Sequence, residues 1–191
     1  MNAAAFRALA ENCAPGVSPS VMEKLVAAES GFEPYAIGVN GQGQRSYTAQ
    51  SAEEAAQLAR RLISEGGSID MGLGQINSAN LEWLGLTPDT VFDACRNLGA
   101  AQTVLREGYV RARERGAEKG TALRQALSSY NTGSPTRGFA NGYVDRVLGG
   151  GQGAVPVAAA ARPAAPRGQA DPPEGWDVFA TSSASGAHVF Q

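Results

Sequence analysis

Residues 19–32 read Pro-Ser-Val-Met-Glu-Lys-Leu-Val-Ala-Ala-Glu-Ser-Gly-Phe, the pattern of a helix that stops at a glycine. Ser18 precedes the stretch as an N-cap, and Pro19 suits the first helical position. Three apolar residues recur at the i, i+4 and i+7 spacing of one helix face: Val21, Leu25 and Ala28. Gly31 is expected to end the helix.

Glu29 lies in the last turn of this expected helix, beside its apolar face and at the edge of a cleft. The C-terminal end of a helix is its negative end, and apolar surroundings disfavour an ionised carboxylate. Both effects raise the pKa of a Glu, and a carboxyl with a raised pKa can act as a general acid near neutral pH. An ordinary solvated Glu at a helix end fits the same position, so position alone does not separate the two.

The overall composition excludes several classes of protein. A chain of 191 residues with 43% apolar and 18% charged side chains indicates one globular domain with an appendage. The net charge of −2 gives no sign of the basic patch that nucleic-acid binding requires. We expect no membrane span, because no apolar run approaches roughly 18 residues. Residues 1–9 do not read as a signal peptide, which leaves the export route undetermined.

Cysteine and histidine are scarce: the chain holds Cys13, Cys95 and, in its tail, His188. Zinc sites need more such ligands close together, so we expect no metal site, and we expect no cofactor. A Ser-His or Cys-His nucleophile pair lacks its His in the globular part. The two cysteines can form a disulfide or remain buried thiols, and the residues alone favour neither.

Composition changes sharply near residue 149, which divides the chain into a domain of residues 1–148 and a tail of residues 149–191. Gly, Ala and Pro dominate the first part of the tail, as in a flexible linker that buries too little apolar area to fold. Trp176 and Phe179 follow, three residues apart. That spacing suits one face of a short docking helix, and a loose tail without a partner accounts for it equally well.

The domain is expected to be mostly helical. Besides the first helix, helical patterns cover 51–65 after a capping box, a short stretch from Thr87-Pro88, and residues 94–115, 121–130 and 140–148. Residues 35–50 instead indicate two short strands around a Gly-rich turn. The predicted fold class is therefore α+β, with helices dominating and one small β-hairpin lobe.

Two later segments combine glycine with amide or phenol side chains. Residues 70–77 read Asp-Met-Gly-Leu-Gly-Gln-Ile-Asn, where the glycines allow close backbone approach or a positive φ. Gln75 and Asn77 can point the same way from an extended chain and bind hydroxyl and acetamido groups. Residues 128–133 read Ser-Ser-Tyr-Asn-Thr-Gly and end a helix. Taken alone, residues 70–77 are more typical of a polar turn, and Tyr130 can be a buried aromatic residue whose hydroxyl is hydrogen-bonded.

Taken together, three motifs resemble the ordered motifs of the soluble lytic transglycosylases of the lysozyme superfamily: Glu-Ser-Gly-Phe at 29–32, Gly-Leu-Gly-Gln-Ile-Asn at 72–77 and Tyr-Asn-Thr-Gly at 130–133. Three more segments look most like the VirB-type transglycosylases of bacterial type IV secretion systems, namely 13–15, 92–98 and 142–144. The resemblance covers about residues 10–148. Gly74 departs from it, since relatives often carry Met there, and this implies a roomier groove floor.

The resemblance implies a lysozyme-like fold with a sugar groove, acting on the β-1,4 bond between N-acetylmuramic acid and N-acetylglucosamine. Glu29 matches the single catalytic acid/base, which protonates the leaving oxygen and then takes the proton of the muramoyl 6-hydroxyl to close a 1,6-anhydro ring. The substrate's acetamido group stabilises the cation in place of a second carboxylate. Tyr130 matches the tyrosine that hydrogen-bonds this Glu. Less specific matches to substrate-binding positions are Ser30, Gln75, Asn77 and Asn131.

Two other functions stay open at this point. A hydrolysing muramidase would need a second carboxylate, for which Asp70 is the better candidate and Glu33 the poorer one. A wall-binding scaffold of a secretion machine would use the tail as its interaction element. The resemblance also implies a periplasmic protein, expected as a monomer, that binds peptidoglycan glycan strands and, through its tail, secretion-system components. Matching cysteines in relatives favour a Cys13–Cys95 disulfide.

Overall fold

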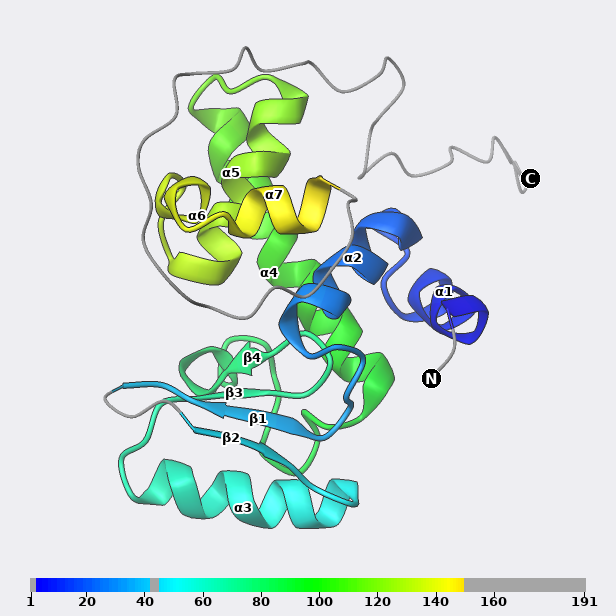
Figure 1. The fold of residues 1–191 in the computed structure, drawn as a ribbon, viewed down its shortest axis with the longest axis vertical. Helices are drawn as coiled ribbons and strands as arrows, with labels where there is room; N and C mark the ends of the chain where they lie inside the picture. The colour runs from blue at the N-terminus through cyan, green and yellow to red at the C-terminus, as the bar shows by residue number, and fades with distance from the viewer. Residues whose placement is uncertain (1–2, 42–44, 150–191) are drawn as a thin grey trace, which may run out of the picture. The chain divides into compact units, whose positions relative to one another are not determined.

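The computed structural model describes residues 3–41 and 45–149 (Figure 1). Its elements in chain order are α1 (Ala3–Cys13), α2 (Pro19–Glu29), β1 (Ala36–Val39), β2 (Arg45–Thr48), α3 (Ala52–Ser64), β3 (Ile69–Met71), β4 (Ile76–Asn77), the 3-10 helix η1 (Ser78–Asn80), α4 (Ala94–Glu114), α5 (Lys119–Thr132), α6 (Arg137–Ala140) and α7 (Tyr143–Leu148). The described residues fall into two compact units, one up to Arg106 and one from Glu107. The predicted tail lies outside the described residues from residue 150 onward, so its boundary at residue 148 stays a prediction.

Helix α2 begins with Pro19 at its first turn and ends at Glu29, as predicted. Ser18 is its N-cap residue, but the Ser18 hydroxyl lies 2.9 Å from that of Ser20 and caps no backbone N–H. The buried face consists of Val21, Met22, Leu25 and Val26. Ala28 is exposed, so the predicted apolar face was wrong at its last position. The buried residues form an i, i+1, i+4, i+5 stripe, and α2 packs against α1.

Four antiparallel strands form one sheet in the order β2-β1-β3-β4. Strands β1 and β2 are the predicted hairpin, and part of its turn, residues 42–44, lies outside the described residues. Strands β3 and β4 enlarge the predicted lobe, with Asp70 opposite Gly38 on one side and opposite Asn77 on the other. They were not predicted because strands of three and two residues are too short to give a readable alternation.

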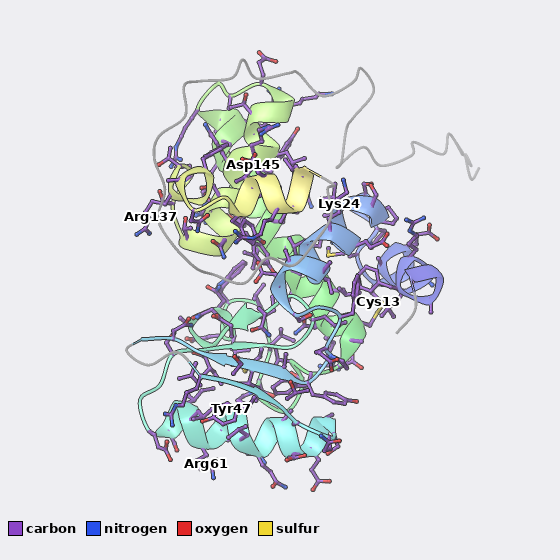
Figure 2. All side chains as sticks on the ribbon, in the orientation of Figure 1. Cys13, Lys24, Tyr47, Arg61, Arg137 and Asp145 are labelled. Carbon is purple, nitrogen blue, oxygen red and sulfur yellow. A yellow bond between two sulfur atoms is a disulfide. The ribbon has the colours of Figure 1, made fainter. Side chains whose placement is uncertain are left out.

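Helix α3 packs on this sheet through contacts with β1 and β3 (Figure 1). The Ser51 half of the predicted capping box is present, since the Ser51 hydroxyl accepts the N–H of Glu54 at 3.2 Å. The Glu54 carboxylate accepts the N–H of Gln50 at 2.8 Å, one residue before the N-cap residue. Ala55, Ala59 and Leu62 are buried. Figure 2 shows Arg61 extending from the outer side of the helix.

Helix α4 is the longest described helix and matches the predicted range of 94–115. Leu98, Ala101 and Leu105 on its predicted apolar side are fully buried. The short helix predicted from Thr87-Pro88 is wrong. That segment is a turn in which the N–H of Val91 reaches the carbonyl of Thr87 at 3.0 Å, and the next helix, α4, begins only at Ala94.

A disulfide joins Cys13 at the end of α1 to Cys95 at the start of α4 (Figure 2). The two Cα atoms are 5.0 Å apart, within the usual range for such bonds. The disulfide prediction is therefore confirmed. It closes a long loop that contains α2, the sheet and α3.

The second unit contains the end of α4 and helices α5, α6 and α7. Its core consists of buried apolar side chains: Ala112, Ala122, Leu123, Ala126, Leu127, Val144 and Val147. The helix predicted over 140–148 is present as α7 but begins only at Tyr143, because Gly142 adopts a φ of 72° and separates α7 from α6. At Gly138, a Cβ would lie 2.6 Å from the Cα of Ser128, so only glycine lets α6 approach α5 this closely.

Candidate active site

Glu29 is the last residue of α2 and is half-buried. The next N–H, of Ser30, donates to the Val26 carbonyl at 3.0 Å and closes the final turn. Gly31 and Phe32 then adopt φ values of 60° and 69°. A left-handed conformation is unusual for a bulky residue such as Phe32, and neighbouring structure must hold it.

An aromatic contact holds Phe32 in this conformation. The ring of Phe32 meets the fully buried ring of Phe6 edge-on, with centroids 5.1 Å apart. Because α1 supplies Phe6, helix α1 fixes the path by which the chain leaves Glu29. The Ser30 hydroxyl lies 3.4 Å from the Val26 carbonyl, a long hydrogen bond that a sugar hydroxyl could replace. Substrate contact by Ser30 stays a prediction.

Residues 72–75 connect β3 to β4, and the first three of them are buried. Gly72 has a φ of 74°, and Gln75 has a φ of 48°. Across residues 3–41 and 45–149, Phe32 and Gln75 are the only non-glycine residues with positive φ. Phe32 lies in the predicted motif at 29–32, and Gln75 lies in the predicted motif at 72–77. Strained backbone of this kind gathers at functional sites, which supports a site formed from these two motifs.

The amide of Gln75 ties its own loop to the sheet. Its Nε2 donates to the carbonyl of Gly72 at 2.9 Å and to that of Ala36 at 3.3 Å. A Cβ on Gly38 would lie 3.1 Å from the Gln75 Oε1, so that glycine leaves room for the amide. Because both protons of Nε2 are already donated to these carbonyls, Gln75 could contact a substrate only by accepting a hydrogen bond at Oε1.

Asn77 belongs to a polar cluster with Asp70. Its Nδ2 donates to Asp70 Oδ1 at 2.7 Å, and its Oδ1 accepts the N–H of Ala79 at 3.0 Å, which caps η1. The other oxygen of Asp70 accepts Nδ2 of Asn40 at 2.8 Å. Asn77 therefore fixes the chain after β4, and its contact with substrate stays a prediction.

Asn97 is a site residue that sequence reasoning did not single out. It lies in α4, is 1% exposed, and its side-chain amide hydrogen-bonds the loop between β3 and β4. Its Oδ1 accepts the N–H of Gly74 at 2.7 Å. Its Nδ2 donates to the carbonyls of Met71 at 3.0 Å and Val91 at 2.8 Å. The sequence does carry a signal for Asn97, because it places an amide next to Leu98 on the apolar side of the longest helix. A polar side chain buried there must be hydrogen-bonded.

In the second unit, Tyr130 and Asn131 lie in the last turn of α5, which Gly133 ends with a φ of 67°. Tyr130 is half-buried. The Oδ1 of Asn131 accepts Nδ2 of Asn141 at 2.9 Å, and the Oδ1 of Asn141 accepts the N–H of Tyr143 at 2.9 Å. Tyr130 and Glu29 belong to different units, and their predicted hydrogen bond stays a prediction.

Ser128 supports this motif through its hydroxyl, a role that the sequence analysis did not predict. Its fully buried hydroxyl donates to the Ser134 carbonyl at 2.6 Å and accepts the N–H of Gly138 at 2.8 Å. The Thr132 hydroxyl also reaches the Ser134 carbonyl, at 3.1 Å. These bonds fix the turn that follows Tyr130.

An open depression of about 530 Å³ lies beside this turn, lined by Thr132, Arg137, Ala140 and Asn141. The Arg137 guanidinium donates to the Thr132 carbonyl and extends from α6 towards solvent (Figure 2). The guanidinium of Arg137 and the amide of Asn141 at this hollow can bind hydroxyl or carboxylate groups. Within the described ranges no three His, Cys, Asp or Glu side chains gather as a metal site requires, and no helix is long and apolar enough to cross a membrane.

A family model described as the transglycosylase SLT domain matches residues 7–147. That range contains every predicted site residue. No solved structure gives a significant match.

Curated relatives match over most of this chain. The protein virB1 of Rhizobium radiobacter is 42% identical over 157 residues, which cover 82% of this chain and 65% of the relative. The protein virB1 of Agrobacterium fabrum (strain C58) is 39% identical over 176 residues, or 92% of this chain and 71% of the relative. The type IV secretion system protein virB1 of Brucella abortus is 40% identical over 150 residues, or 75% of this chain and 62% of the relative. The chain thus spans just under two thirds of the length of the first of these relatives.

Proposed function

Because the chain belongs to the family of transglycosylase SLT domains, we propose that it is a lytic transglycosylase of peptidoglycan. Its substrate is the β-1,4 bond between N-acetylmuramic acid and N-acetylglucosamine. Its product carries a 1,6-anhydromuramoyl end. The family match and the three ordered motifs support this activity, since the matched range includes all of them.

In the proposed mechanism Glu29 acts first as acid and then as base. Its carboxyl proton passes to the glycosidic oxygen as the bond to the muramoyl C1 breaks. The muramoyl acetamido oxygen stabilises the cation at C1. The carboxylate of Glu29 then takes the proton of the 6-hydroxyl, whose oxygen bonds to C1 and closes the ring. Glu29 ends the cycle protonated, and water is not consumed.

One observation supports ring closure over hydrolysis: both oxygens of Asp70 accept amide protons, from Asn77 and from Asn40. A carboxylate held this way is a structural acceptor, poorly suited to attack C1 or to activate water. Glu33, the other carboxylate considered, is exposed in the turn after α2, where its N–H donates to the Ser30 carbonyl. Neither residue thus supports a muramidase.

The Brucella abortus relative is named as a type IV secretion system protein. We extend this to the chain and propose that it acts on the cell wall in the periplasm, where local cleavage of glycan strands opens a passage for a secretion or conjugation machine. The Cys13–Cys95 disulfide supports an oxidising compartment. A monomeric state and a partner for the tail are part of the same proposal.

The experiment is mass spectrometry of the products released from purified peptidoglycan. Muropeptides with anhydromuramoyl ends are expected. Reducing muramoyl ends would identify a muramidase. Intact sacculi in the presence of folded protein would favour a wall-binding scaffold. Glu29→Gln serves as the inactive control in the same assay.

A further inference from the structure

Trp83 is the most exposed large apolar side chain of the described residues, with half of its surface open to solvent. It lies in the hydrogen-bonded turn that follows η1, within the first unit. Nothing in the proposed chemistry uses it. An exposed aromatic residue needs no explanation by itself, so the question is how the indole is held.

The indole is anchored at its one polar atom. Nε1 donates to Oδ1 of Asn80 at 3.0 Å, which satisfies the only hydrogen-bond donor of the ring. A ligand can therefore meet this side chain only through its apolar face and edges. The anchor also limits rotation, so the face is held ready before a ligand arrives.

The anchor continues into the candidate site. Asn80 is the last residue of η1, and η1 is capped by Asn77 through the N–H of Ala79. Asn77 in turn bonds to Asp70 in β3 at 2.7 Å. The turn that carries Trp83 is held by Leu81, whose side chain is buried. The Leu81 carbonyl also accepts the N–H of Leu86 at 2.9 Å. The polar network of the Gln75–Asn77 motif therefore also sets the position of Trp83.

From this arrangement we propose that Trp83 is a stacking platform for a sugar ring of the glycan strand, at a subsite next to the Gln75–Asn77 motif. The inference rests on the proposed function for the identity of the strand. The C–H groups on the face of a β-linked pyranose carry slight positive charge and lie against the negative face of an aromatic ring. Asn80 and Glu82 beside the ring can bond the hydroxyl and acetamido groups at the sugar edge.

A sugar fits this surface better than a protein partner does. Protein interfaces place aromatic residues inside a wider apolar core. In the described part of the first unit, Trp83 is the one exposed large apolar side chain, and it stands in the chain between the exposed Glu82 and the half-buried Leu84. A single exposed aromatic face, anchored by the amide of Asn80, is suited to one sugar ring.

The first test uses fluorescence. The chain has two tryptophans, so Trp176→Phe leaves Trp83 as the only indole. We expect a saturable change in Trp83 emission when this protein is titrated with a β-1,4-linked tetramer of N-acetylglucosamine. No change at concentrations that saturate binding by another method would overturn the proposal, as would the absence of any binding.

The second test uses kinetics on peptidoglycan. Trp83→Ala is expected to raise KM on the order of two- to tenfold, the size of one aromatic contact, with kcat little changed. Trp83→Phe should raise it less. Val110→Ala removes an exposed apolar side chain of the second unit and should leave KM unchanged. A Trp83→Ala protein that matches this control would overturn the proposal.

The two proposals fail separately. If the protein releases no anhydromuramoyl ends, the proposed function is wrong, while the fluorescence titration still decides whether Trp83 binds the glycan. If anhydromuramoyl ends form at a KM that does not respond to Trp83→Ala, the platform is wrong and the function stands. The titration alters no residue of the first unit, so it remains decisive even if Trp83→Ala is unstable.

Discussion

Asn97 in α4 accepts a hydrogen bond from the backbone N–H of Gly74 at 2.7 Å, although the two residues are 23 positions apart. Together with its bonds to Met71 and Val91, this contact makes one buried amide the support of the loop that carries Gln75. Buried amides of this kind are strongly coupled to stability, because each broken bond leaves a backbone group without a partner.

Asn97→Ala is therefore expected to lower the free energy of unfolding by about 1–3 kcal/mol for the buried polar groups it leaves unsatisfied. Chemical denaturation measures this. Asn12→Ala is the control, since its amide bonds an exposed carbonyl within α1 at 2.9 Å and should matter little. Equal effects of the two substitutions would contradict the role given to Asn97.

Gly72→Ala should destabilise the protein for two separable reasons. Its φ of 74° strains any side chain, and the new Cβ would lie 2.4 Å from Nδ2 of Asn97. Gly85→Ala is the matched control, because Gly85 has a φ of 65° with no atom near the would-be Cβ. We expect Gly72→Ala to lower the denaturation midpoint more than Gly85→Ala, and the excess to shrink when Asn97→Ala is also present. An excess that is unchanged in the double variant would show that the clash is not with Asn97.

Reduction of the Cys13–Cys95 disulfide should destabilise the protein by about 4 kcal/mol in the chain-entropy model, because the bond spans 82 residues. Denaturation with and without a thiol reductant measures this difference. A variant with both cysteines changed to Ser should resemble the reduced protein and not respond to reductant. Two thiols titrating in protein prepared under oxidising conditions would refute the bond.

Glu29→Gln should lower the cleavage rate on the order of 10²–10⁴-fold while the protein stays folded, because Gln keeps the shape but moves no proton. Glu65→Gln is a matched control: Glu65 is the C-cap residue of α3, so it too is a carboxylate at a helix end. It should keep full activity. Release of anhydromuramoyl ends at an undiminished rate by folded Glu29→Gln protein would rule out the assignment.

Tyr130→Phe tests the predicted hydrogen bond to Glu29. A phenol that donates to a carboxylate lowers its pKa, so loss of the hydroxyl should raise the pKa of Glu29. Glu29 would then stay protonated to higher pH, and the alkaline limb of kcat/KM against pH should move upward, with a smaller loss of rate than in Glu29→Gln. Tyr47→Phe in β2 is the control. A rate and pH profile like the control's would make Tyr130 a packing residue.

Local signals in the sequence predicted most helices. The Pro19 start and Gly31 end of α2, the Ser51 capping box and the long apolar stripe of α4 act over a few neighbouring residues, so they can be seen in a linear chain. The failures were also local: the Thr87 segment has the cap and proline of a helix start but forms only one turn. Cap signals mark where a helix can begin, and packing decides whether it continues.

The sequence by itself determined the α+β class, the hairpin and the order of the three motifs, because each depends on the spacing of nearby residues. Only the tertiary structure decided what holds those motifs in place. Asn97 reaches back to the loop of Gly74, Phe6 packs on Phe32, and Asp70 accepts protons from Asn40 and Asn77. The partners in these contacts are separated by up to 30 positions in the chain. No local pattern encodes such pairs, since they form only when the folded backbone brings buried polar and aromatic groups to partners that satisfy them.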